Sequence, residues 1–207
     1  MSKELILSRA EKLIKARVST YDSGHDWWHI VRVRNLAKII NEKENLEEPF
    51  LVDLAALFHD FADSKFNGTK PGEGYEIAGR FLAENGMENC HSEITGIMRN
   101  VSFSSRKTPV NKDDSLLCII QDADRLDAIG AIGIARAFSY GGYRNNIIYS
   151  PVAEENSMST INHFYEKLLL LSAMMNTETG KKMAHERHVF LEIFLDQFHK
   201  EWNAGSF

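Results

Sequence analysis

The chain has 207 residues, of which 43% are hydrophobic and 26% are charged, a balance typical of a globular protein with one buried core. Its formal net charge of -5 argues against a general affinity for nucleic-acid polymers or anionic membranes, because both attract basic surfaces. An anionic small-molecule substrate is not excluded, since a bound dication and a few local Lys or Arg residues can reverse the field at one site.

The sequence gives no sign of export or membrane insertion. The N-terminal stretch MSKELILSRAEKLIKARV has charges inside its apolar pattern, unlike a signal peptide, and no apolar run is long enough to span a bilayer. Cys90 and Cys118 have no CxxC spacing, and we interpret them as buried free thiols, which suits a reducing cytoplasm. We therefore expect a cytoplasmic protein.

Helical periodicity dominates the first 60 residues. Apolar residues between positions 5 and 18 recur with the spacing of an amphipathic helix. After a break at residues 21–24, a second helix is predicted from about Trp27 to Glu42. Pro49 suits the first turn of a third helix. That helix is strongly apolar from Phe50 to His59, so we expect it to be central and buried.

The rest of the chain is predicted to consist of helices separated by two loops. Residues 63–74 (DSKFNGTKPGEG) form the clearest loop, and residues 139–157 form the second. Helices are expected over residues 75–85, 88–101, 113–136, 160–175 and 179–202, and Asp113 or Asp114 would cap the third of these. Because no repeat or inter-domain linker is visible, we predict one all-α domain, a helical bundle, over residues 1–207.

Three of the predicted apolar helices each carry residues that can bind a metal ion. These residues are His29 at the start of the second helix, His59 and Asp60 at the end of the third, and Asp122, Asp124 and Asp127 within the helix over 113–136. Burying a carboxylate is costly unless a positive partner compensates, and a bound cation is such a partner.

Each of these features has a simpler explanation when taken alone. His29 could be a hydrogen-bonded, half-buried histidine, the His59-Asp60 pair a helix end in solvent, and the aspartates a solvated face paired with Arg125. Together they favour a metal site. Imidazole and carboxylate suit Mn²⁺, Fe²⁺, Co²⁺, Ni²⁺ or Zn²⁺, and Mg²⁺ can be accommodated. Such a metal acidifies its bound water and neutralises charge on a phosphoryl group.

The order His29, then His59-Asp60, then Asp124 resembles that of the HD-domain metal-dependent phosphohydrolase superfamily. The surrounding segments GHDWWHIVRVRNLA, DLAALFHDFADSKF and QDADRLDAIGAIGIARAF are similar to those of stand-alone bacterial members. The resemblance covers nearly the whole chain and implies an all-helical bundle with the metal held between central helices. It implies His29, His59, Asp60 and Asp124 as ligands. Asp124 matches the final aspartate better than Asp122, which could instead support a ligand from outside the coordination sphere.

The resemblance also implies three residues that act on the substrate. Asp63, three residues after the His-Asp doublet, matches a catalytic carboxylate that could orient water or relay a proton. Lys65 could contact a phosphate, and His25 could donate to the same group or protonate a leaving oxygen. The alternatives are a capping or loop aspartate, a solvated lysine and a loop histidine.

One departure bears on the number of metal ions. Relatives often have a histidine where this chain has Val101, and His91 is the nearby substitute, which we interpret as a helix-surface residue. We therefore expect one divalent metal ion, with Mn, Fe, Ni, Co and Mg left open, rather than two. We interpret His185 and His188, like Arg125 and Arg136, as structural.

The expected function is metal-dependent hydrolysis of a phosphorylated small molecule, and a nucleotide is the substrate we expect first. The reaction would be cleavage of a nucleoside triphosphate to a monophosphate and pyrophosphate, or cleavage of a phosphomonoester. One alternative is a non-catalytic signalling module that binds a metal and a nucleotide. Another is a hydrolase of cyclic nucleotides or (p)ppGpp. The sequence leaves the substrate's base and the oligomeric state open.

Overall fold

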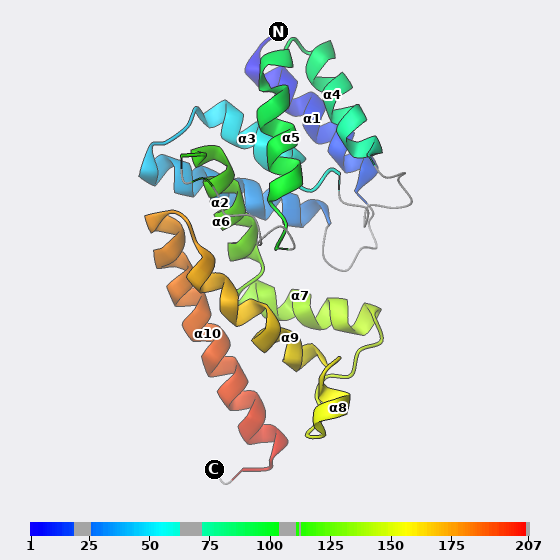
Figure 1. The fold of residues 1–207 in the computed structure, drawn as a ribbon, viewed down its shortest axis with the longest axis vertical. Helices are drawn as coiled ribbons and strands as arrows, with labels where there is room; N and C mark the ends of the chain where they lie inside the picture. Colours follow the sequence, from blue (N-terminus) through cyan, green and yellow to red (C-terminus); the bar gives the residue numbers. More distant parts are fainter. Residues whose placement is uncertain (19–25, 63–71, 104–110, 112, 206–207) are drawn as a thin grey trace. The chain divides into compact units, whose positions relative to one another are not determined.

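The computed structural model describes residues 1–18, 26–62, 72–103, 111 and 113–205. Within these ranges every regular element is a helix and no strand occurs (Figure 1), so the all-α prediction is confirmed. The contacts divide the chain into two compact units, Met1–Asp124 and Arg125–Phe207, which are described one after the other. The assignment of all 207 residues to one domain stays a prediction.

The first unit holds the N-terminal helices. Its elements are α1 (Lys3–Arg17), α2 (Trp27–Glu44), α3 (Pro49–Phe58), α4 (Glu73–Glu84), the 3-10 helix η1 (Glu88–Cys90), α5 (His91–Asn100) and α6 (Ser115–Asp127), whose last three residues belong to the second unit.

Helix α3 forms the centre of the first unit, as its sequence predicts. It begins at Pro49, and the Glu48 side chain accepts a hydrogen bond from the Leu51 backbone N–H at 3.2 Å. All but two of its residues are buried, because α1, α2 and α5 pack around it. A helix that is apolar on every side must be covered on every side. This packing places the residues that follow Phe58 at the inner end of a rigid, buried element.

Helix α6 begins where a cap was expected. The Asp114 side chain accepts a hydrogen bond from the Leu117 backbone N–H at 3.0 Å, so Asp114 is the capping residue of the two candidates. Cys90 and Cys118 are both buried and neither forms a disulfide, as predicted.

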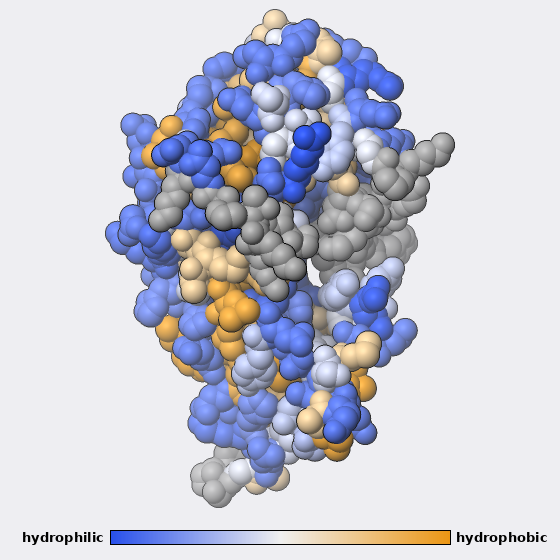
Figure 2. Space-filling view, viewed as in Figure 1, coloured by the Kyte–Doolittle hydropathy of each residue, from blue (hydrophilic) through white to orange (hydrophobic). Residues whose placement is uncertain are grey.

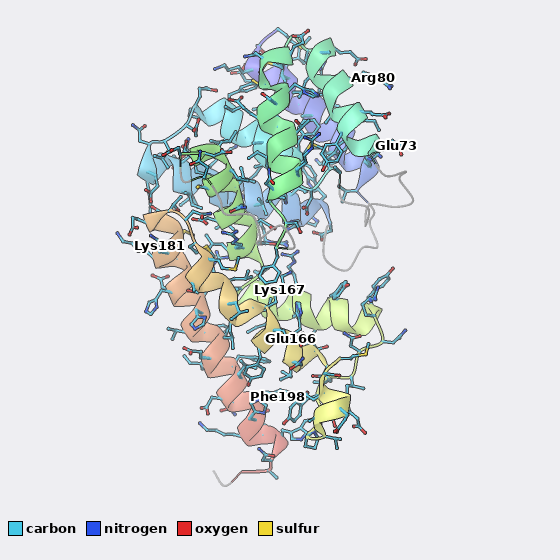
Figure 3. All side chains as sticks on the ribbon, in the orientation of Figure 1. Glu73, Arg80, Glu166, Lys167, Lys181 and Phe198 are labelled. Carbon is cyan, nitrogen blue, oxygen red and sulfur yellow. The ribbon has the colours of Figure 1, made fainter. Side chains whose placement is uncertain are left out.

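The second unit is built around the long C-terminal helix. Its elements are α7 (Gly130–Tyr143), α8 (Ala153–Asn156), α9 (Thr160–Glu166), the 3-10 helix η3 (Leu168–Met174) and α10 (Glu178–Trp202). Helix α10 packs on α7 and η3. The ring of the fully buried Phe164 stacks on Phe194 with centroids 5.7 Å apart, and Phe198, labelled in Figure 3, stacks on Trp202 at 5.9 Å.

The prediction of one continuous helix over residues 113–136 is wrong. The chain turns between α6 and α7, because Gly130 adopts a left-handed conformation with φ of 74°. A glycine adopts this conformation without the steric cost that a side chain brings. Gly133 keeps the turn tight, since a Cβ at this position would lie 2.3 Å from the Ala128 carbonyl oxygen.

Two other boundaries also differ from the prediction. Helix α7 extends to Tyr143, and α8 lies inside the segment predicted as a loop over 139–157. The helix predicted over 160–175 is α-helical only to Glu166 and continues as the 3-10 helix η3. Boundaries are weakly specified by sequence pattern, because tertiary packing decides where a marginal turn stays helical.

The two arginines interpreted as structural hold the start of the second unit together. Arg136 donates to the Asp127 carboxylate at 2.7 Å and to its backbone carbonyl at 3.2 Å. Arg125 is buried and donates to the Met174 carbonyl at 2.5 Å. The structural interpretation of both residues is therefore confirmed.

The visible surface is mainly hydrophilic, with hydrophobic patches between polar regions (Figure 2), and exposed apolar side chains include Ile193 and Met158. Among the helices described, none has both the length and the apolar content that a bilayer span requires.

Candidate metal centre

His29 is positioned by the start of α2. Asp26 caps this helix, and its Oδ1 accepts a hydrogen bond from the His29 backbone N–H at 2.7 Å. An aspartate at this position satisfies a backbone donor that the first helical turn leaves open. His29 therefore lies in the first turn, and its side chain is fully buried, as the sequence pattern predicts.

His59 and Asp60 follow directly after the last residue of α3. The Nδ1 of His59 donates a hydrogen bond to the Ala56 carbonyl at 2.8 Å. A proton held on Nδ1 leaves the lone pair of Nε2 available to a metal ion, and it also fixes the orientation of the ring. The side chain of His59 is completely buried and that of Asp60 nearly so.

The four side chains meet through a small group of atoms. The Nε2 atoms of His29 and His59 are 3.3 Å apart. The Asp60 Oδ2 lies 3.3 Å from the His29 Nε2 and 3.4 Å from the His59 Nε2. The Asp124 Oδ1 lies 3.5 Å from the first and 4.0 Å from the second of these nitrogens.

These separations fit a divalent metal ion. Two ligand atoms that each lie about 2.1 Å from one ion are about 3.0 Å apart at a right angle and about 3.4 Å apart at the tetrahedral angle. Most of the observed distances fall in or near this range. Among the described residues, His29, His59 and Asp124 form the one group of three or more ligand-type side chains with atoms mutually within 4.8 Å. Asp60 is not a member of this group, although its Oδ2 lies beside both imidazole nitrogens and offers a fourth candidate ligand atom.

The electrostatics of the group also suit a cation. Burial alone would lower the pKa of His59, but the Asp60 and Asp124 carboxylates and the Ala56 carbonyl raise it to about 9. The two carboxylates therefore keep the buried His59 imidazole protonated at neutral pH in the absence of metal. A divalent ion can replace that proton and satisfy both carboxylates.

Asp124 and Asp122 have different places on α6. Asp124 keeps 25% of its side chain exposed and belongs to the group, whereas Asp122 is fully buried and lies outside it. Asp124 therefore remains the ligand candidate on α6, as a prediction. A role for Asp122 in supporting the ligands stays a prediction.

The remaining site predictions are only partly described. His25, Asp63 and Lys65 lie outside the described residues. Val101 is buried, and His91 is exposed at the start of α5 and takes no part in the group. Among the described residues, one group of ligand-type side chains is present. The expectation of one metal ion rather than two stays a prediction.

The sequence did not indicate the Ala56 carbonyl as part of the site. Its role depends on the backbone of α3, which leaves carbonyls near its C-terminal end open to side-chain donors. The Asp26 cap could have been found, because Asp immediately before an apolar helix is a common capping signal.

A comparison with known families identifies the arrangement. Residues 27–129, which contain all four side chains, match the model of the HD domain. The chain belongs to the HD-domain superfamily. This HD-domain protein is 37% identical over 203 residues to the uncharacterized protein YpgQ of Bacillus subtilis, with 94% of each chain covered.

Solved structures extend the likeness to the fold. The HD-domain chain is similar to an HD-superfamily hydrolase from Bacillus thuringiensis, with 36% identity, a TM-score of 0.75, and coverage of 98% of this chain and 100% of that one. It is also similar to Bacillus subtilis YpgQ crystallised in complex with ADP, with 32% identity, a TM-score of 0.76 and 97% of each chain covered. The superfamily recognised from the sequence is therefore confirmed.

Proposed function

We propose that this protein is a hydrolase that uses one divalent metal ion to cleave a phosphate bond of a nucleotide. The observation that carries the proposal is the group of His29, His59 and Asp124, with the Asp60 carboxylate beside both imidazoles, because the distances between these nitrogen and oxygen atoms suit ligands of one cation. The likeness to an HD-superfamily hydrolase supports the reaction class. The ADP bound to a similar protein supports a nucleotide as substrate.

The four residues would hold the metal, and each contributes in a different way. His59 presents Nε2 because Ala56 holds its other nitrogen, and Asp60 and Asp124 supply negative charge that offsets the dication. When bound, the metal would lower the pKa of a water ligand and neutralise charge on a phosphate oxygen. The partial exposure of Asp124 leaves one side of the group open to solvent and to a substrate.

The proposal assigns the substrate-side roles to residues implied by the family resemblance. Asp63 would accept a proton from the attacking water, while Lys65 and His25 would bind phosphate oxygens. The products would be a nucleoside monophosphate and pyrophosphate, or a nucleoside and orthophosphate. Which bond breaks depends on where these groups hold the phosphate chain.

The test is an activity screen of nucleoside mono-, di- and triphosphates crossed with Mn²⁺, Co²⁺, Ni²⁺, Fe²⁺ and Mg²⁺, with pyrophosphate and orthophosphate measured separately. We expect turnover with at least one dication and loss of more than a hundredfold in kcat/KM for Asp60→Ala. Asp196→Asn, which removes an exposed carboxylate paired with Lys200 on α10, should keep the activity of the unchanged protein.

Two results would contradict the proposal. One is tight binding of metal and nucleotide with no turnover under any condition, which would indicate a non-catalytic binding module. The other is an Asp60→Ala variant that folds and hydrolyses nucleotides at an unchanged rate.

A further inference from the structure

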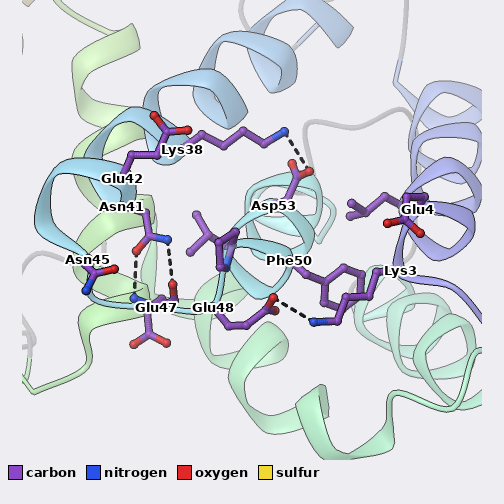
Figure 4. Close-up of a pocket in the computed structure, with 13 residues that line it drawn as sticks. Lys3, Glu4, Lys38, Asn41, Glu42, Asn45, Glu47, Glu48, Phe50 and Asp53 are labelled. Carbon is purple, nitrogen blue, oxygen red and sulfur yellow. Dashed lines mark hydrogen bonds and ion pairs between the residues drawn. The ribbon is translucent and has the colours of Figure 1, made fainter.

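A cavity of about 620 Å³ lies between the start of α1, the end of α2 and the start of α3 (Figure 4). Its size is within the range of small-molecule sites, about 300–1,000 Å³. It opens at the N-terminal end of α3, whereas His59 follows the C-terminal end. The lining reaches as far along α3 as Asp53, which lies six positions before His59, a rise of about 9 Å along the helix axis.

Two carboxylate–ammonium pairs line this cavity, and both are drawn in Figure 4. The Lys3 Nζ lies 2.9 Å from the Glu48 Oε1, and the Lys38 Nζ lies 3.0 Å from the Asp53 Oδ2. The Lys3 ammonium also lies 5.3 Å from the centroid of the Phe50 ring. An ammonium group binds favourably where a carboxylate lies beside an aromatic face, because both attract its positive charge.

The carboxylates are held in place more firmly than the lysines. The other oxygen of Glu48 accepts the hydrogen bond that caps α3. The side chain of Asp53 is only 7% exposed and is also bound by Arg34. The side chain of Glu48 is 50% exposed, similar to those of Lys3 and Lys38 at 59% and 41%, so Glu48 is held by its capping hydrogen bond and not by burial. Long exposed lysine stems lose conformational entropy when fixed, so these pairs are weak and exchangeable.

The rest of the lining favours a cation with an apolar body. The lining has five acidic side chains and two basic ones, and Leu7 and Val52 are among its apolar members. Glu48 and Asp53 are five positions apart, a rise of about 7.5 Å between their backbone positions along the helix axis, and both line the cavity. A short alkyl chain with an ammonium group at each end can span the region between them.

We propose that this cavity binds a linear diamine, whose two ammonium groups take the places of Lys3 at Glu48 and Lys38 at Asp53. The alkyl chain lies along the apolar lining between the two carboxylates. This site is independent of the metal centre and of the proposed hydrolase activity.

Isothermal titration calorimetry at constant ionic strength tests the proposal with 1,4-diaminobutane and 1,5-diaminopentane as ligands. We expect saturable binding of at least one diamine. Binding of 1-aminobutane should be at least tenfold weaker, and 1,4-butanediol should not bind. Glu48→Gln should weaken diamine binding at least fivefold, while Lys3→Met and Lys38→Met should each tighten it severalfold because they remove an internal competitor.

A matched control separates this effect from a general change of surface charge. Lys181→Met removes an exposed lysine, labelled in Figure 3, that pairs with Glu178 at 2.6 Å on α10, and it should leave the affinity unchanged. The proposal is overturned if no diamine binds the unchanged protein or the Lys3→Met variant, or if the monoamine binds equally well. It is also overturned if Lys181→Met tightens binding as much as Lys3→Met. The Lys3→Met result decides the question even if Glu48→Gln fails to fold.

Discussion

Asp53 and His59 lie six positions apart on and just beyond α3, and both are charged groups in buried surroundings. Burial opposes the charged form of each, raising the pKa of the Asp53 carboxyl and lowering that of the His59 imidazole. In both cases neighbouring charges outweigh burial: Arg34 and Lys38 bring the pKa of Asp53 below its ordinary value. Asp60 and Asp124 raise that of His59 to about 9. At the scale of single residues, specific partners therefore decide which charges the core of the first unit contains.

The Asp53 carboxylate is expected to make a large contribution to stability. Asp53→Asn should lower the free energy of unfolding at pH 7 by roughly 2–4 kcal/mol, because it leaves the part-buried Arg34 without its bidentate partner. The pKa of Asp53 is lower in the folded protein than its ordinary value of 3.8. The stabilisation by the Asp53 carboxylate is therefore complete above pH 3.8. It is lost as pH falls through the lower pKa of the folded protein.

Urea denaturation between pH 7 and pH 2.5 measures this effect. The difference between the unchanged protein and Asp53→Asn should be greatest near neutral pH and should shrink in acid. Glu178→Gln removes an exposed carboxylate from an i, i+3 pair and should leave the midpoint of urea unfolding nearly unchanged across the pH range. A constant difference across the pH range would contradict the assignment to the Asp53 charge.

At the scale of the elements, the corner between α6 and α7 separates one predicted helix into two. Helix α6 carries Asp124 and ends three residues later, and the chain then turns through the left-handed Gly130. Two further contacts fix the corner: a Cβ on Gly130 would lie 3.0 Å from the Arg187 Cγ, and Arg187 donates to the Leu126 carbonyl. The end of α6 is thus set by backbone conformation and by capping from α10.

Gly130→Ala tests the importance of this corner. A left-handed alanine costs about 1–2 kcal/mol, and the contact with Arg187 adds crowding. We therefore expect a Tm lower by roughly 3–8 °C for a protein of this length. Differential scanning calorimetry measures the change.

Gly142→Ala in the same helix α7 is the matched control. Nothing lies within 4 Å of a Cβ at this position, and alanine favours a helix over glycine by about 1 kcal/mol. The control should be neutral or stabilising. Equal stability of Gly130→Ala and the unchanged protein would show that the corner tolerates a side chain.

At the scale of the whole molecule, the candidate metal centre joins parts of the chain that are distant in sequence. His29 starts α2, His59 and Asp60 follow α3, and Asp124 lies near the end of α6. A metal bound by the folded chain and not by the unfolded one stabilises the fold by mass action, by about 2.7 kcal/mol when its free concentration is one hundred times the Kd. The same ion must displace the proton that His59 holds below pH 9.

We therefore expect Mn²⁺ to raise the Tm and the increase to be larger at pH 8 than at pH 6. In the metal-free protein, the contribution of His59 to stability decreases as pH rises, opposite to the effect of the metal. Its pKa lies above the ordinary value of 6.5, so its contribution is complete below that value and is lost as pH rises toward 9. Thermal unfolding with Mn²⁺, with EDTA, and with Asp60→Ala measures the shift. A shift of the same size in Asp60→Ala would place the metal elsewhere.

The sequence determined the helical class, the buried central helix, an aspartate cap for α6 at position 113 or 114, and the superfamily. Each depends on local patterns: apolar spacing gives helices, continuous apolar content gives burial, and short motifs identify relatives. The ligand candidates His29, His59, Asp60 and Asp124 could be named for the same reason, since ionisable residues inside apolar stretches are conspicuous.

Only the tertiary structure decided where these elements end and what surrounds the charged groups. The break at Gly130, the 3-10 continuation after Glu166 and the hydrogen bond from His59 to the Ala56 carbonyl all depend on contacts with segments or backbone atoms that a sequence pattern does not specify. The elevated pKa of His59 has the same origin, because Asp124 lies 65 positions away in the sequence and reaches the histidine only through the packing of α6 in the first unit. Local spacing fixes the kind of residue available, whereas the fold fixes the distances between charges, and electrostatic energies depend on those distances.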